Sequence, residues 1–200
     1  MAKLPKSFYL KDDVLQLSKD LLGKHLYTKI NGKKTGGIIV ETEAYRAPED
    51  RASHAFGNKR TPRTETMFHE GGVCYIYLCY GIHHLFNVIT NKKDIPHAIL
   101  IRAIEPIIGI EIMQKRRNKK KIDRSLTAGP GALSQALGIT TKLDTTNLTG
   151  NKIWIEKGIK IYMDNEINAS PRVGVESAKE SAKLLWRFRV KDNSWTSISK

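Results

Sequence analysis

Two carboxylates in an apolar stretch are the first side chains of this sequence that could do chemistry. Residues 37–45 read Gly-Ile-Ile-Val-Glu-Thr-Glu-Ala-Tyr, a pattern typical of a β-strand, and the carboxylates are Glu41 and Glu43. Because successive strand side chains point to opposite faces, we expect both carboxylates and Tyr45 on one face. A carboxylate in an apolar strand is destabilising unless it is paired, hydrogen-bonded or used in a reaction. This face is therefore the first candidate site.

Aromatic side chains elsewhere in the chain could complete such a site. Tyr75 and Tyr77 share one face of a predicted strand, Tyr80 stands where that strand ends, and Asn87 follows. Flat rings stack on nucleobases, and such stacking contributes about 1–3 kcal/mol per base. A single strand tyrosine is more often a core residue than a ligand contact. The combination with two carboxylates and a long glycine-bearing loop over 46–72 favours a binding pocket.

The charge of the chain points to a polyanionic partner. The sequence has 34 Lys and Arg against 20 Asp and Glu, a formal net charge of +14, which favours nucleic acid or an anionic membrane surface. The membrane is the weaker alternative, because the sequence has no apolar run of about 18 residues and residues 1–6 lead into no signal-peptide core. We expect a soluble, intracellular protein of the cytoplasm or nucleoid, without a membrane partner.

The densest basic stretch covers residues 115–124. It holds seven positive charges and one negative charge, a net +6. A solvated loop of like charges and a non-specific contact to phosphates are equal alternatives for this stretch.

The cysteines and histidines do not form a pattern for metal binding. Cys74 and Cys79 lie five positions apart in one predicted strand, so they point to opposite faces and cannot readily form a disulfide. The six histidines include no His-Glu-x-x-His motif, and no Cys-x-x-Cys pair is present. We therefore expect reduced thiols, no metal and no cofactor.

The periodicity of the chain predicts one α+β domain over residues 1–200, built as a curved, mainly antiparallel β-sheet with surrounding helices. A helix over 14–21 is predicted after a cap at Asp12 or Asp13, another after Pro106 that continues into the basic stretch, and a short one over 132–137. Strands are predicted over 25–30, 36–45, 73–80, 97–104, 152–156, 159–163, 172–175 and 185–190.

Blocks spread over nearly the whole chain resemble one known family, the alkyladenine DNA glycosylases, also called 3-methyladenine DNA glycosylases of the mammalian type. Chance rarely places so many blocks in one order. Ala47 and Gly71 depart from residues common in the family, and neither is a pocket residue. The blocks are 40–45 (VETEAY), 52–55 (ASHA), 67–68 (MF), 75–77 (YIY), 80–81 (YG), 87–88 (NV), 100–103 (LIRA), 105–106 (EP), 129–131 (GPG) and 171–175 (PRVGV).

The resemblance implies a monofunctional DNA glycosylase. Such an enzyme flips damaged purines, such as 3-methyladenine and 7-methylguanine, out of double-stranded DNA and hydrolyses the N-glycosidic bond, which initiates base excision repair. By resemblance, Glu43 is the general base that activates water, and Glu41 is a hydrogen-bonded support residue. Arg102 helps to hold the water or the sugar-phosphate, and its place in an apolar strand requires an acidic or phosphate partner.

The resemblance also assigns the base pocket. The flipped base lies between Tyr45 on one side and His54 with Tyr77 on the other. Asn87 opposes the 2-amino group of guanine, and Tyr80 is the wedge that enters the gap in the duplex. No lysine stands out as a Schiff-base nucleophile, so no strand-cleaving lyase activity is expected.

Two other classes of function are open at this point. A sugar-directed glycoside hydrolase would use Glu41 and Glu43 about 5–5.5 Å apart, but the net charge of +14 argues against a neutral sugar. The second class is a non-catalytic basic nucleic-acid-binding module, in which Glu43 is only a buried structural acid. We expect a monomer, both for a DNA glycosylase and for a nucleic-acid-binding module.

Overall fold

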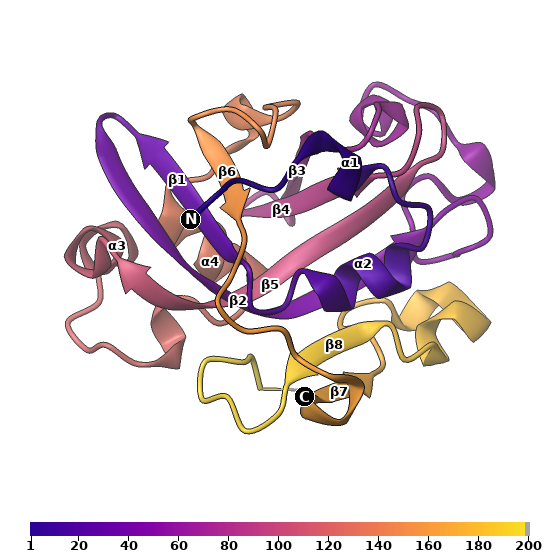
Figure 1. Ribbon diagram of the computed structural model, residues 1–200. Coiled ribbons are helices and arrows are strands. Elements are labelled where there is room, and N and C mark those ends of the chain that lie inside the picture. Colours follow the sequence, from indigo (N-terminus) through magenta and orange to yellow (C-terminus); the bar gives the residue numbers. More distant parts are fainter. Residues whose placement is uncertain (199–200) are drawn as a thin grey trace.

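An eight-stranded antiparallel sheet organises the chain, which is described here over residues 1–198 of a computed structural model (Figure 1). The strand order is β3-β4-β5-β2-β1-β6, and β8 pairs with both β2 and β7. The expected α+β class with a mainly antiparallel sheet is confirmed. The strands are β1 (His25–Ile30), β2 (Lys33–Arg46), β3 (Cys74–Cys79), β4 (His83–Thr90), β5 (His97–Ile108), β6 (Ile153–Glu156), β7 (Ile167–Ser170) and β8 (Arg187–Val190).

Four α-helices and several short 3-10 turns surround the sheet over residues 1–198. The Asp13 side chain caps the second helix by accepting hydrogen bonds from the backbone N–H groups of Leu15 and Gln16, each at 3.0 Å. The α-helices are α1 (Lys6–Tyr9), α2 (Val14–Asp20), α3 (Ile110–Arg117) and α4 (Pro130–Leu137), and the 3-10 helices are η1 (Phe56–Asn58), η2 (Glu65–Phe68), η3 (Arg124–Leu126), η4 (Thr141–Leu143), η5 (Asp164–Glu166) and η6 (Glu176–Lys183).

The two faces of the sheet carry different helices. In Figure 1, α1 and α2 lie in front of the sheet and α4 lies behind it. Thr42 of β2 faces α2, where its hydroxyl donates a hydrogen bond of 2.9 Å to the carbonyl of Ser18. Its neighbours Glu41 and Glu43 are therefore free to point to the other face, which is the face where α4 packs against β4 and β5.

Several predicted elements differ in the structure. Residues 159–163 and 172–175 form no strand, although their alternating apolar pattern predicts one. The helix after Pro106 begins only at Ile110, because β5 continues to Ile108 alongside β2 before Gly109, at φ 71°, turns the chain. The strands β4 and β7 lie where the sequence predicted none.

Cys74 is buried, and both it and Cys79 are free thiols. Within residues 1–198 no helix has both the length and the apolarity needed to cross a bilayer. The same residues contain no cluster of three or more His, Cys, Asp or Glu side chains that could hold a metal ion.

Candidate active site

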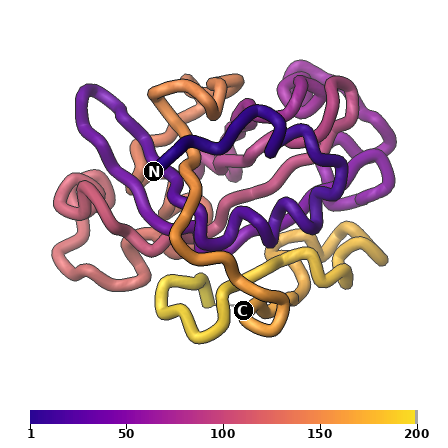
Figure 2. Tube along the Cα trace, viewed as in Figure 1, coloured from indigo at the N-terminus to yellow at the C-terminus, as the bar shows by residue number. Residues whose placement is uncertain are grey.

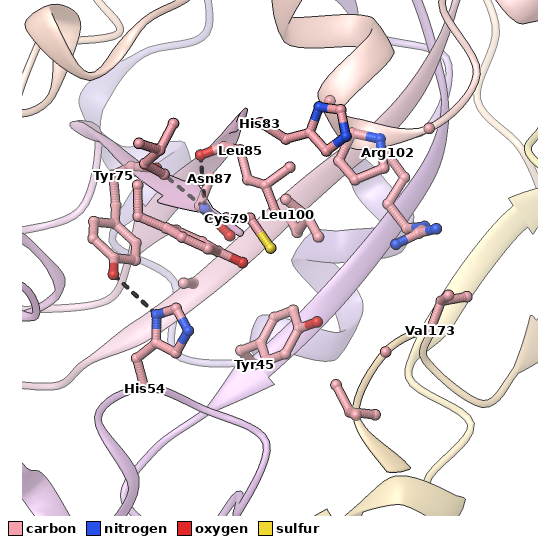
Figure 3. A pocket seen from close by; sticks show the side chains of 18 of the residues that line it. Tyr45, His54, Tyr75, Cys79, His83, Leu85, Asn87, Leu100, Arg102 and Val173 are labelled. Atoms are coloured by element: carbon pink, nitrogen blue, oxygen red, sulfur yellow. Dashed lines mark hydrogen bonds between the residues drawn. The ribbon is translucent and has the colours of Figure 1, made fainter. Parts of the chain in front are cut away.

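A cavity of about 800 Å³ opens on the face of the sheet that carries α4 (Figure 3). Strands β2 to β5, the loop over 46–72, the start of α4 and residues 173–175 all contribute to its wall. Six side chains predicted from the sequence meet here, although they come from segments far apart in the chain. They are Tyr45, His54, Tyr77, Tyr80, Asn87 and Arg102.

Glu43 lies directly behind the cavity wall instead of lining it. Its side chain is completely buried, and three donors hold its carboxylate. The Tyr45 hydroxyl donates to Oε2 at 2.8 Å, the backbone N–H of Val173 donates to Oε1 at 2.9 Å, and Arg102 Nη1 lies 3.2 Å from Oε1. A carboxylate offers about four lone-pair positions, so one position on Oε2 is left for a further donor. Glu43 is thus a fixed carboxylate with one acceptor position on Oε2 that the described residues leave open.

Glu41 is held by four donors, and none of them belongs to a residue that faces only the cavity. Its Oε1 accepts hydrogen bonds from Nε of Arg102 and Nε of Arg187, both at 2.8 Å, and from the Ser197 hydroxyl at 2.8 Å. Its Oε2 accepts the backbone N–H of Ser197 at 2.7 Å. Burial raises the pKa of Glu41, but the two guanidinium groups outweigh burial and hold that pKa below its usual value. Glu41 therefore stays ionised as the anchor of Arg102.

A bulge in β2 lets the two carboxylates converge on one arginine. The pairing of β2 with β5 shifts register on both sides of Glu41, between Ile39 and Thr42. Arg102 of β5 reaches Glu41 through Nε and Glu43 through Nη1. The expectation that Arg102 needs an acidic partner in its apolar strand is confirmed, and the partner is the carboxylate pair itself.

Three aromatic side chains pack together on one wall of the cavity. The rings of Tyr75 and Tyr77 stack with centroids 5.4 Å apart and planes 29° apart, and His54 meets Tyr77 edge-on at 4.6 Å. His54 Nδ1 lies 3.0 Å from the Tyr75 hydroxyl (Figure 3). Burial and the nearby Arg63 guanidinium lower the pKa of His54 to about 4. At neutral pH the three rings are therefore uncharged, and the charge beside them is the Arg63 guanidinium, which lies 5.3 Å from the centre of the Tyr77 ring.

Tyr45 is braced from behind by residues to which the sequence assigned no role. The guanidinium of Arg172 lies 4.7 Å from the centre of the Tyr45 ring. Arg172 is itself fixed, because its Nη2 donates to Asp50 at 2.8 Å and its Nη1 to the carbonyl of Ala44 at 2.8 Å. Both side chains of the Arg172–Asp50 pair are completely buried. Their separation of 122 positions left no local pattern that could have predicted the pair.

Asn87 is a buried part of the cavity wall. Its Nδ2 donates hydrogen bonds to the backbone carbonyls of Tyr75 at 3.1 Å and Leu85 at 3.4 Å. These bonds join the side chain to β3 and to its own strand β4, so its position in the cavity wall is fixed.

Tyr80 stands at the tip of the hairpin that joins β3 to β4. The backbone N–H of Ile82 donates to the carbonyl of Cys79 at 3.1 Å, and both central residues of this turn have positive φ, 51° at Tyr80 and 73° at Gly81. Positive φ at both positions is the mark of a type I′ turn, which suits a tight hairpin. The Tyr80 side chain is 88% exposed at the cavity rim. A large aromatic ring is thus presented to solvent by a rigid turn.

The basic stretch over 115–124 divides into two parts. Arg116 donates to the carbonyl of Ala136 at 3.1 Å, and Arg117 donates to the carbonyls of Leu126 and Ser125, so these guanidinium groups brace the turn beside α4. Residues 118–121 are exposed beyond the end of α3. Lys115 and Arg124 are exposed as well, so five side chains of the stretch (Lys115, Lys119, Lys120, Lys121 and Arg124) are placed to meet an external polyanion.

Comparisons with known proteins agree with this geometry. A family described as methylpurine-DNA glycosylase matches residues 7–194. A relative from Chlamydia felis is 48% identical over 186 residues, which are 92% of this chain and 94% of that protein. Relatives from Clostridium acetobutylicum and Bacillus cereus are 41% and 44% identical, and the alignments cover 99% and 96% of this chain and 98% of each relative. All three carry the name "Putative 3-methyladenine DNA glycosylase". The chain belongs to the methylpurine-DNA glycosylase family and is, as its sequence predicted, a DNA glycosylase that hydrolyses N-glycosyl bonds.

Proposed function

We propose that this glycosylase releases alkylated purines, with 3-methyladenine and 7-methylguanine as its principal substrates, from double-stranded DNA. One observation carries the proposal: the fixed carboxylate of Glu43 lies directly behind an aromatic cavity large enough for a purine nucleoside. Release of the damaged base leaves an abasic site, which is the first step of base excision repair. Residues 1–200 act as one glycosylase domain and as a monomer inside the cell.

The aromatic cavity suits a cationic base. We assign one stacking surface to Tyr45 and the other to Tyr77 with His54, as the family resemblance implies. A positively charged alkylpurine is attracted to the faces of aromatic rings. His54, with a pKa of about 4, carries no charge at neutral pH that would repel such a base. The same positive charge makes the alkylpurine a good leaving group, so a second general acid is not required.

Asn87 supplies the discrimination against guanine in this proposal. Because its Nδ2 is tied to two backbone carbonyls, the side chain cannot rotate away without breaking both hydrogen bonds. A purine with an exocyclic 2-amino group would meet this fixed side chain at the cavity wall.

Glu43 acts as the general base in the hydrolysis. A water molecule would take the open lone-pair position on Oε2, beside the hydroxyl of Tyr45, and transfer a proton to the carboxylate as its oxygen attacks C1′ of the sugar. Arg102 keeps the carboxylate oriented by its ion pair of 3.2 Å. Because Glu43 is completely buried, the side chains that cover it have to shift as the nucleotide enters, so that water can reach Oε2.

The lining of the cavity supports a monofunctional enzyme. A glycosylase with lyase activity needs an amine nucleophile to form a Schiff base with the sugar. Within the described residues, the cavity is lined by Arg63, Arg102 and Arg117 but by no lysine. Water is therefore the nucleophile, and the DNA strand stays intact.

Tyr80 is the wedge that fills the gap left by the flipped nucleotide, and its removal gives a sharp prediction. Taking a base out of the stack costs a few kcal/mol, which an inserted side chain partly offsets. Tyr80→Ala should therefore reduce the single-turnover rate of base release from duplex DNA by about tenfold or more, a difference of about 1.4 kcal/mol in the barrier. Release from the same lesion in single-stranded DNA should change little. Equal losses on the two substrates would contradict the wedge role.

The exposed basic residues predict a strong salt dependence of DNA binding. The logarithm of duplex affinity should fall with the logarithm of salt concentration by about 0.9 for each phosphate contact. Replacing Lys119, Lys120 and Lys121 with Ala should lower this slope by up to about 2.7 if all three contact phosphates. Fluorescence anisotropy between 50 and 300 mM salt measures the slope. A variant slope equal to that of the wild type would place the DNA elsewhere on the surface.

The competing proposal is a protein that binds DNA without cleaving glycosidic bonds. The assay that separates the two is release of free base from an alkylated duplex that the protein demonstrably binds. A protein that saturates the duplex and releases no base would be a binding module.

A further inference from the structure

Residues 159–163 have the sequence pattern of a strand but pair with no other strand. Ile159, Ile161 and Met163 alternate along the segment, and their side chains are 87%, 74% and 65% exposed. Between them, Tyr162 packs against the hydrophobic core and Lys160 pairs with Glu166 at 2.8 Å. The segment is thus anchored on one side and presents three large apolar side chains to solvent on the other.

The backbone of this segment is also open. Within residues 1–198, none of residues 159–162 forms a hydrogen bond from its backbone to another backbone group. The carbonyl of Lys160 lies against Gly23, so the remaining backbone groups are the ones open to a partner. An extended segment with such groups is a template on which another chain can add as a strand. Proteins normally protect such an edge with charge, a bulge or a covering loop. Here the edge carries apolar side chains, so an interaction site is the simpler explanation.

A groove of about 500 Å³ lies along the same segment. Leu4, Pro5 and Phe8 form its apolar floor opposite Ile159 and Ile161.

The charged residues of the groove are lysines. Lys11, Lys24 and Lys157 line it, and no acidic residue does so among the described residues. Lys11 pairs with Asp20 at 3.5 Å, whereas neither Lys24 nor Lys157 has a carboxylate within ion-pair distance in the described part of the chain. Burial lowers the pKa of Lys24, and the nearby Asp20 carboxylate offsets only part of this decrease. The groove therefore combines apolar side chains with two lysines, Lys24 and Lys157, that form no ion pair within the described part of the chain.

The groove lies on the face of the molecule opposite the active-site cavity. Figure 2 shows the segment after β6, in orange, crossing the front of the molecule near the start of the chain. Helix α4 lies behind the sheet, whereas α1 and the segment after β6 lie in front (Figure 1). Residues at the start of α4 line the cavity, and residues of α1 and of the segment after β6 line the groove. A partner in the groove would leave the cavity and Tyr80 free to engage DNA.

We propose that residues 159–163 and the adjoining groove bind an extended acidic peptide segment of another protein by strand addition. Apolar side chains of the peptide would contact Ile159, Ile161 and the groove floor, and its carboxylates would pair with Lys24 and Lys157. A second copy of this chain fits poorly, because it would bring lysines against lysines in a protein of net charge +14. Lipid fits poorly as well, because it cannot pair with the open backbone groups of the segment.

A random twelve-residue peptide library displayed on phage tests this proposal. Wild-type protein and the variant Ile161→Asp are used as separate targets, and Ile122→Asp is the control because Ile122 is also exposed, at 58%, in the basic stretch. Wild type and the control should enrich sequences in which apolar and acidic residues alternate, and Ile161→Asp should not. Retained base release by Ile161→Asp shows that this variant is folded.

The strongest enriched peptide then tests the mode of binding. Its affinity should fall at least tenfold for Ile161→Asp and for Lys24→Glu combined with Lys157→Glu, and should weaken with salt. Hydrogen exchange of amides 159–162 should slow when the peptide is bound. The proposal is wrong if no peptide is enriched, if enriched peptides are not acidic, if exchange is unchanged, or if Ile161 instead controls dimerisation in sedimentation experiments. Ile161-dependent binding to phosphatidylglycerol vesicles with no peptide enriched would identify a lipid surface and also overturn it.

Discussion

Glu43→Gln should lower the rate of base release by about 10²–10⁴-fold, the contribution of a positioned general base. Glutamine keeps the shape of the side chain, but it has no basic carboxylate to take a proton from water. Glu43 is buried behind the cavity wall and is not exposed on the protein surface that would meet the duplex. The affinity for duplex DNA should therefore stay within about twofold of wild type. Single-turnover release from an alkylated duplex, with protein in excess, measures the rate at saturation.

The matched control for this variant is Glu111→Gln, which removes an exposed carboxylate in the first turn of α3. Both variants lose one negative charge, so a general effect of charge on DNA binding appears equally in both. If Glu43→Gln releases base at the wild-type rate, Glu43 is not the general base. If Glu43→Gln loses DNA affinity together with base release, the substitution has disturbed the structure of the site and does not test the general base.

Glu41→Gln should instead destabilise the protein by about 3–5 kcal/mol, the usual effect of removing one partner from a buried ion pair. The change leaves Arg102 and Arg187 buried side by side without their shared anion. Urea unfolding should show this loss of stability. Glu43→Gln should lose less stability, because in that variant Arg102 still forms its ion pair with Glu41. Equal stabilities of wild type and Glu41→Gln would show that Glu41 does not anchor the arginines.

The pH dependence of stability gives a second test of Glu41. Its pKa is lowered in the folded protein from the ordinary value of 4.5. The folded state therefore binds this proton less readily than the unfolded state, so the stability that Glu41 provides is complete above pH 4.5 and is lost as the pH falls through the lowered pKa. Wild type should lose stability more steeply than Glu41→Gln below about pH 4.5. Parallel curves would contradict the assignment.

The parts of the site that depend on local sequence were predictable. The carboxylates in β2, the tyrosines of β3 and the end of that strand at Tyr80 follow from strand alternation, and the structure places them as expected. The hairpin turn at Tyr80 was not predicted, because its second strand, β4, was not. The roles of these residues came from the family resemblance, since spacing alone could not separate Glu43 from Glu41. The structure separates the two residues by their partners: Glu41 has only structural donors, whereas Glu43 lies against the cavity.

The parts that depend on long-range contacts were not predictable. The Arg172–Asp50 pair joins residues 122 positions apart, and Arg187 reaches Glu41 across 146 positions. Residues 172–175 do not form a strand, since Gly174, at φ 74°, interrupts the extended backbone. Residues 159–163 have the pattern of a strand, but no neighbouring strand is placed to pair with them. The periodicity of the sequence predicts which side chains point to the same face of a segment. It does not predict whether another strand lies beside that segment to pair with its backbone.

The most direct test of the central claim is product analysis after wild-type protein is saturated with a duplex that carries one 7-methylguanine. Liquid chromatography with mass spectrometry identifies any free base, and a denaturing gel reports whether the strand is cut. We predict free 7-methylguanine, an intact strand with one abasic site, and no protein trapped on DNA by borohydride. A bound duplex that yields no free base would contradict the proposed function, and a borohydride-trapped complex would contradict water as the nucleophile.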